Sequence, residues 1–147
     1  MRVIIGADHG GFETKEKIVT LLEEKGYEVE DVGAYQQNGD DDYVDYATKA
    51  ALQMNEGNKT ILFCRNGMGM CIVANKFKGV RCGLGFGLEA VRKGRIDDNI
   101  NALAIPTDYV SFEGVKEMVE IFLNTEASAE EKYSRRIKKI IELEQKW

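Results

Sequence analysis

The chain alternates short apolar runs with longer segments in which apolar residues recur at helical spacing. The short runs predict strands at residues 3–7, 27–32, 60–64, 80–84 and 102–105. The amphipathic segments predict helices at residues 12–25, 43–54, 70–77, 88–93, 112–123 and 129–145. Because each strand is followed by a helix, we expect an α/β fold, a doubly wound five-stranded parallel sheet with right-handed crossovers and an extra C-terminal helix.

The length of 147 residues fits one domain, predicted here to span residues 1–147, and the chain contains no repeat, low-complexity run or linker. The last helix follows the last strand with no further strand after it. It therefore either packs on the sheet edge or reaches across to another subunit.

Composition narrows the class of protein. A net charge of −5 argues against a general nucleic-acid binder or a protein that binds anionic membranes, and no apolar stretch is long enough for a transmembrane helix. The opening residues are a poor match to a signal peptide. The cysteines at 64, 71 and 82 form no CxxC pair and lie far from the single histidine, so we expect no metal site. Reduced thiols are typical of a cytoplasmic protein.

Ligands of doubly wound sheets bind at the carboxyl ends of the strands. We therefore expect the site among three segments assigned to such positions, residues 8–11, 64–69 and 97–101.

Cys64 ends a predicted strand and precedes a glycine-containing loop that opens a helix. The positive end of that helix is expected to lower the pKa of the thiol and favour the thiolate. The amides of Gly67 and Gly69 are placed to hold an anion. The alternatives are that Cys64 is a small buried apolar residue and that the glycines only form a tight turn. The loop is neither a dinucleotide fingerprint nor a Walker loop.

Two further groups of residues are candidates by position. Asp8 and His9 follow the first strand at the mouth of the sheet. Lys132 and Arg136 lie four residues apart on the last helix, so that one helix face presents two cations to a phosphate, although the alternative is a solvated charged face. The acidic run at residues 40–42 is expected to be a solvated loop.

Taken together, these residues resemble the ribose-5-phosphate isomerase B family, which also contains the galactose-6-phosphate isomerase subunits. The resemblance begins in IIGADHGGFETKEKIVTLLEEKGYEVEDVG and continues through DDYVDYA. CRNGMGMCIVANKFKGVR is similar to the family motif CGTGxGMSIAANK-x-x-GIR, and FLNTE and KYSRRIKKI complete the match. The order and spacing of these segments make coincidence improbable.

The resemblance implies a flavodoxin-like or Rossmann-like fold and a homodimer or tetramer with its active site across the subunit interface. It implies aldose–ketose isomerisation of a small-molecule sugar phosphate, without metal or other cofactor, most simply between ribose 5-phosphate and ribulose 5-phosphate. By resemblance, Cys64 is the base that moves a proton between C1 and C2, and the loop amides hold the enediolate oxygen. Asp8 and Tyr43 then line the sugar, while His9, Lys132 and Arg136 bind phosphate.

The departures from the family pattern fall at ligand positions. Asp97 and Asp98 occupy the start of the family's HNDAN segment, so the histidine thought to open the sugar ring is replaced by Asp97. Arg65 and Asn66 replace the Gly-Thr that follows the cysteine, which removes the hydroxyl usually assigned to ring opening.

We expect Asp97, with Asp8, to take over the ring-opening proton transfer, and Arg65, Asn66 and Asp98 to contact substrate. Two alternatives stay open. One is an isomerase of a different sugar, which is open-chain, a tetrose or hexose, or unphosphorylated. The other is a non-catalytic sugar-phosphate-binding subunit that pairs with a paralogue.

Overall fold

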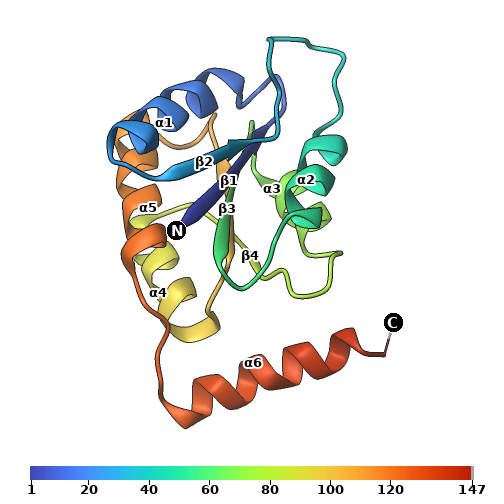
Figure 1. Ribbon diagram of the computed structural model, residues 1–147, viewed down its shortest axis with the longest axis vertical. Coiled ribbons are helices and arrows are strands. Elements are labelled where there is room, and N and C mark those ends of the chain that lie inside the picture. Colours follow the sequence, from blue (N-terminus) through green and yellow to red (C-terminus); the bar gives the residue numbers. More distant parts are fainter. Residues whose placement is uncertain (147) are drawn as a thin grey trace.

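A computed structural model of the protein describes residues 1–146 (Figure 1). In chain order its elements are β1 (Arg2–Ala7), α1 (Phe12–Glu24), β2 (Glu28–Asp31), α2 (Tyr43–Leu52), β3 (Asn58–Cys64), α3 (Met68–Ala74), β4 (Cys82–Leu84), α4 (Leu88–Asp98), β5 (Ala102–Pro106), α5 (Phe112–Asn124) and α6 (Glu131–Glu144).

The five strands form one parallel sheet in the order β2-β1-β3-β5-β4, which confirms the predicted fold class. The chain leaves β1 for β2 on one side and returns to β3 on the other. The carboxyl ends of β1 and β3 therefore flank a switch point, the position at which doubly wound sheets bind their ligands. At the other end of the sheet, β5 lies between β3 and β4.

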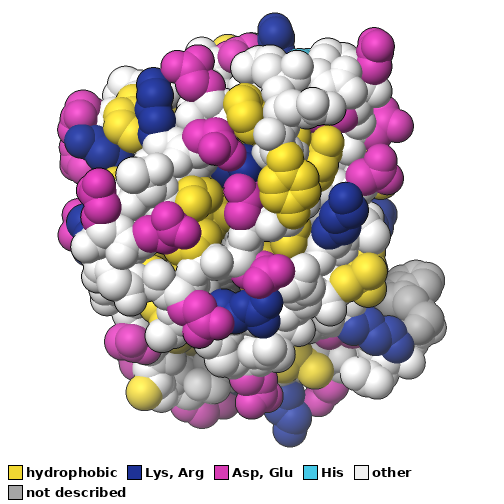
Figure 2. All heavy atoms as spheres, turned by 45° about the horizontal axis from the view of Figure 1, so that its top comes forward, with side chains coloured by type: hydrophobic (Ala, Val, Ile, Leu, Met, Phe, Trp, Pro, Cys, Tyr) yellow, Lys and Arg dark blue, Asp and Glu magenta, His cyan; other side chains and the backbone are white. Residues whose placement is uncertain are grey.

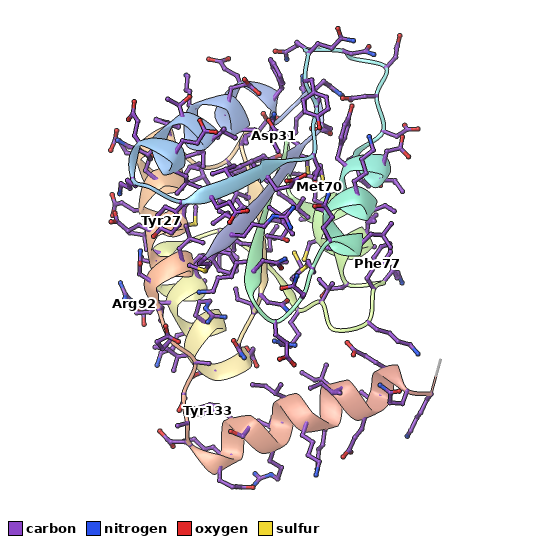
Figure 3. The ribbon with its side chains drawn as sticks, viewed as in Figure 1. Tyr27, Asp31, Met70, Phe77, Arg92 and Tyr133 are labelled. Carbon is purple, nitrogen blue, oxygen red and sulfur yellow. The ribbon has the colours of Figure 1, made fainter. Side chains whose placement is uncertain are left out.

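The two faces of the sheet are packed with side chains of different size. On the face covered by α1, α4 and α5, large residues such as Ile61, Phe63 and Leu103 are fully buried. On the face covered by α2 and α3 the packing residues include many alanines, and Met70 fills the space between α3 and the sheet (Figure 3). The small residues let α2 and α3 lie close to the sheet, and Cys64 belongs to this second cluster.

Helix α6 stands apart from the sheet, at the end of the molecule opposite the carboxyl ends of the strands (Figure 1). None of its described residues is buried, although Ile140, Ile141 and Leu143 are apolar. Its apolar stripe is therefore not covered by the rest of the described chain. Among residues 1–146, no helix is both long and apolar enough to span a membrane.

Helix α4 extends further than predicted. It passes through Gly94 and ends at Asp98, followed by Asn99 in the left-handed conformation with φ of 47°. Gly94 does not end the helix. Instead it allows close packing, because a Cβ atom there would lie 3.0 Å from Cδ1 of Ile100.

Candidate active site

The loops that follow β1, β3 and β5 meet at the switch point. Ala7 pairs with Phe63 in the sheet register, so the segments that begin at Asp8 and Cys64 leave the sheet side by side. Thr107, after β5, ties them together, because its backbone N–H donates to the Cys64 carbonyl (3.0 Å) and its hydroxyl to the Gly10 carbonyl (3.0 Å). Three strand ends thus form one rigid platform.

Cys64 is the last residue of β3, and its side chain lies under the first turn of α3. The residue is 5% exposed, and the backbone N–H of Gly67 donates to its sulfur at 3.1 Å. Gly67 takes a φ of 74°, and a Cβ atom there would lie 2.7 Å from Cδ1 of Leu84. Glycine is therefore required for both the turn and the close packing that aims this amide at the sulfur.

The pKa of the Cys64 thiol moves in the direction opposite to the one expected from sequence. Burial raises the pKa, and the amides of Met70, Gly67 and Asn66 lower it by a smaller amount, while the charge of Asp8 adds to the rise. The prediction of a lowered pKa is therefore wrong for the described chain. The helix start does favour the thiolate, but loss of water outweighs it.

Asp8 is buried at the end of β1 and accepts hydrogen bonds from the amides of Gly10 (2.9 Å) and Gly11 (3.2 Å) through one oxygen. Burial raises the pKa of this carboxyl, partly offset by the Gly11 amide and then by His9. Its charge influences the Cys64 thiol, so the two groups share one electrostatic environment.

Tyr43 and Arg65 also lie at this end of the sheet. Tyr43 begins α2, and its ring lies against Gly69 in the first turn of α3. A Cβ atom added at Gly69 would lie 2.6 Å from Cε2 of Tyr43. The side chain of Arg65 covers Gly10 in the same way: a Cβ atom added at Gly10 would lie 2.5 Å from Cγ of Arg65. The side-chain oxygen of Asn66 accepts the amide of Met68 (3.0 Å), which shapes the loop.

The structure thus brings together most of the predicted site residues within one chain: Asp8, His9, Tyr43, Cys64, Arg65, Asn66, Gly67 and Gly69. Figure 2, in which this end of the molecule comes forward, shows hydrophobic side chains surrounded by acidic and basic ones. Exposed apolar residues in or next to the segments that follow the strand ends include Tyr35, Tyr43, Met68, Phe86 and Tyr109.

The remaining predicted residues lie elsewhere. Asp97 and Asp98 are the last two residues of α4 and precede β5, so they stand at the amino-terminal edge of the sheet, opposite Cys64. The expectation that they follow a strand end is wrong, because α4 runs directly into the start of β5. Lys132 and Arg136 are exposed on α6, near Tyr133, also away from Cys64 (Figure 3).

Two residues of the site were not found from sequence. Asp41 was expected in a solvated loop, but its side chain is only 7% exposed and lies 2.6 Å from Nδ1 of His9. Thr107 directly follows β5, so the strand-end rule applied to that strand would have found it. No sequence pattern indicated that Asp41 is buried, because its partner His9 lies 32 residues away in the sequence.

A hollow of about 830 Å³ lies between α6 and the amino-terminal edge of the sheet. Lys59, Arg81 and Arg95 line it from the body, and Ile137 and Ile141 line it from α6. Lys59 donates to the last carbonyls of α5, and burial followed by the charge of Arg95 lowers its pKa to about 8. This hollow does not contain Cys64.

Within residues 1–146, no three His, Cys, Asp or Glu side chains are grouped as metal ligands. The site instead offers a thiol, two carboxyl groups, an imidazole and backbone amides. Such a set suits an enzyme that moves protons on a substrate in which negative charge develops.

Comparison with known proteins agrees with this class. The family model described as "Ribose/Galactose Isomerase" matches residues 3–140. Ribose-5-phosphate isomerase B of Mycolicibacterium paratuberculosis is 32% identical over 146 residues, covering 98% of this chain and 92% of that protein. A 4-deoxy-4-sulfo-D-erythrose isomerase from a Clostridium species is 37% identical over 127 residues, 85% of this chain and 80% of that one.

A solved structure shows the same fold. Ribose-5-phosphate isomerase B of Mycoplasma genitalium, crystallised with bound ribulose 5-phosphate, superposes with a TM-score of 0.94 at 31% identity, covering 99% of this chain and 97% of that one. The chain belongs to the ribose/galactose isomerase family. The predicted family is therefore confirmed, and with it the enzyme class, an aldose–ketose isomerase.

Proposed function

We propose that the protein interconverts the aldose and ketose forms of a small sugar phosphate through a cis-enediolate, with Cys64 as the base and no metal. The observation that carries this proposal is the position of the Cys64 sulfur at a strand end, with the Gly67 amide 3.1 Å away. The relatives named ribose-5-phosphate isomerase B support ribose 5-phosphate and ribulose 5-phosphate as the substrate pair.

The step balances without a co-reactant. The Cys64 thiolate removes the proton from C2 of the open-chain aldose, and the C–H electron pair forms the C1–C2 double bond as O1 becomes an oxyanion. The amides of the Gly67–Gly69 turn stabilise that charge. The proton on O2 moves to O1, the thiol returns its proton to C1, and C2 becomes the carbonyl of the ketose.

The complete site requires a second copy of the chain. Cys64 lies at one edge of the sheet, whereas Asp97, Lys132 and Arg136 lie toward the other. In a homodimer or a tetramer, these residues from one subunit complete the site of its partner, where Lys132 and Arg136 bind the phosphate. The uncovered apolar stripe of α6 supports such an assembly.

A second candidate substrate is favoured by the residues at the two positions that the family uses to open the sugar ring. Asp97 and Asn66 stand where the family has a histidine and a threonine, and the chain has one histidine in all. A four-carbon aldose with a sulfonate on C4 has no hydroxyl that can close a five-membered ring, so it needs no ring-opening group. The Clostridium relative named for such a sugar therefore supports a short open-chain substrate with a terminal anion.

A substrate panel separates these proposals. The purified protein is incubated with ribose 5-phosphate, erythrose 4-phosphate, 4-deoxy-4-sulfoerythrose and unphosphorylated ribose, and ketose formation is followed. Preference for ribose 5-phosphate supports the first candidate, and preference for a four-carbon substrate supports the second. Binding without turnover of any sugar would instead indicate a non-catalytic subunit.

Cys64→Ala tests the base, with Cys71→Ala as the matched control because Cys71 points away from the switch point, toward the Cys82 carbonyl. We expect kcat to fall by about 10²–10⁴-fold in the first variant, the usual contribution of a general base, and to stay near wild type in the second. Full activity of Cys64→Ala would exclude the proposed mechanism.

A further inference from the structure

The single histidine of the chain is bound to a buried carboxylate. Asp41, in the loop before α2, lies with its Oδ1 2.6 Å from Nδ1 of His9 and 3.2 Å from the backbone N of His9. Gln37 donates to the His9 carbonyl (2.9 Å) and ties the same two loops together. Two segments separated by 32 residues are thus joined at one imidazole.

The burial of the pair is unequal. The Asp41 side chain is 7% exposed and that of His9 is 28% exposed, so the carboxylate lies inside and the ring is partly open to the site. Oδ2 of Asp41 is buried and has no hydrogen-bond partner among the described residues. A buried carboxylate with few partners binds the ones it has strongly, and here His9 supplies them.

A carboxylate can only accept hydrogen bonds, so the proton of the neutral imidazole must sit on Nδ1. Nε2 is then left as the ring nitrogen available to a ligand. Asp8 at the end of β1 and Tyr46 of α2 are titratable neighbours of this pair, and Asp45 acts on Tyr46 in turn. Arg65, after β3, covers Gly10, the residue next to His9. Burial, and then Asp41, raise the pKa of Tyr46.

We propose that Asp41 is a positioning residue of the active site, which fixes the tautomer and orientation of His9 so that Nε2 meets the anionic end of the substrate. The role of Nε2 toward substrate rests on the proposed function, whereas the tautomer does not. The exposed acidic neighbours Asp40 and Asp42 have no such contact in the described chain.

The tautomer is measured without substrate. With one histidine in the chain, the ¹⁵N signals of a labelled sample need no assignment between histidines. In the wild type, the neutral ring should carry its proton on Nδ1. In Asp41→Ala, Nε2 protonation should predominate, as in an unconstrained histidine, whereas Asp40→Ala should match the wild type. A neutral wild-type ring protonated on Nε2 would overturn the proposal.

The functional part is tested by a double-mutant cycle on the substrate that the panel identifies. Asp41→Ala should lower kcat/KM by about 10–100-fold, the range for losing a charge-assisted hydrogen bond. If Asp41 acts through His9, the same change should cost nothing further in a His9→Gln background. Equal losses in both backgrounds would overturn the proposal. Asp41→Asn keeps an acceptor for Nδ1–H and should recover part of the rate.

If no sugar is turned over, the proposed function fails and this inference is decided by binding. Inorganic phosphate is then titrated into the labelled protein, and the Nε2 signal of His9 is followed. A shift of that signal, with a weaker apparent affinity in Asp41→Ala than in Asp40→Ala, supports the positioning role. An affinity equal in the two variants, or no shift at all, contradicts it.

Discussion

The two edges of the sheet carry different halves of the candidate site. At the carboxyl edge, Asp8, His9 and Cys64 are already held by hydrogen bonds within one chain. At the amino edge, Asp97 has a buried oxygen without a hydrogen-bond partner in the described chain. On α6, Arg136 is exposed. The difference teaches that one chain already holds the residues proposed for proton transfer, whereas the residues proposed to anchor the substrate lie far from them in the same chain.

Among the variants that compare the two edges, the largest expected effect is at the glycine turn of the carboxyl edge. Gly67→Ala adds a Cβ atom 2.7 Å from Leu84 and disturbs the amide that faces Cys64, so kcat should fall by about 10²–10³-fold, as for loss of an oxyanion donor. The measurement is steady-state kinetics. Gly79→Ala is the control, because Gly79 has a similar φ of 80° with nothing within 4 Å of the added atom. Equal losses in both variants would show that backbone strain alone is responsible.

The next effect concerns α6. Arg136→Ala should weaken substrate binding, raising KM by about 10–100-fold with little change in kcat, because a charge-assisted hydrogen bond to the phosphate is lost. Arg135→Ala is the matched control, since Arg135 is already paired with Glu131 at 2.7 Å. If Arg135→Ala raises KM as much as Arg136→Ala, general surface charge explains the result.

The pH dependence follows from the raised pKa of Cys64. Below that pKa, the thiolate fraction grows about tenfold per pH unit, so kcat/KM should rise from pH 6 to pH 8 without a plateau. Because the charge of Asp8 helps to raise this pKa, Asp8→Asn should move the rising limb to lower pH. A plateau already present at pH 6 would show that the thiol is ionised despite its burial.

The smallest expected effect is a difference in alkylation rate between two thiols, Cys71 in α3 and Cys64 at the end of β3. A hydrogen bond with Cys82 lowers the pKa of Cys71 to about 7, whereas burial raises that of Cys64. Iodoacetamide at pH 7.5 should therefore label Cys71 before Cys64, as read by mass spectrometry of the digested protein. Earlier labelling of Cys64 would mean that its sulfur is more open and more ionised than the structure indicates.

Sequence reasoning found the carboxyl edge because the strand-end rule depends only on local pattern. It placed Asp8 and Cys64 side by side correctly, since their strands pair directly. It misplaced Asp97, because Gly94 lies inside a helix that continues to Asp98. It gave the wrong direction for the pKa of Cys64, because the pattern shows the helix start but not the loss of water around the sulfur.

Asp41 was missed for another physical reason. An acidic run looks solvated from sequence, and only the path of the loop shows that one of its carboxylates turns inward to His9. The proposed joining of the two halves across subunits came from the family resemblance, because the hydrophobic pattern of one chain carries no information about a partner. Both cases involve contacts between segments far apart in the sequence or on different molecules.

Mixing two variants tests the shared site most directly, when all samples are assayed at a substrate concentration well below the wild-type KM, where each variant alone is nearly inactive. Cys64→Ala and Arg136→Ala proteins are unfolded together, refolded and assayed, with each variant refolded alone as control. If the site combines Cys64 of one subunit with Arg136 of its partner, random dimers regain about a quarter of wild-type activity, because half of them hold one intact site of two. Activity no higher than the mean of the two separate variants would contradict a site shared between subunits.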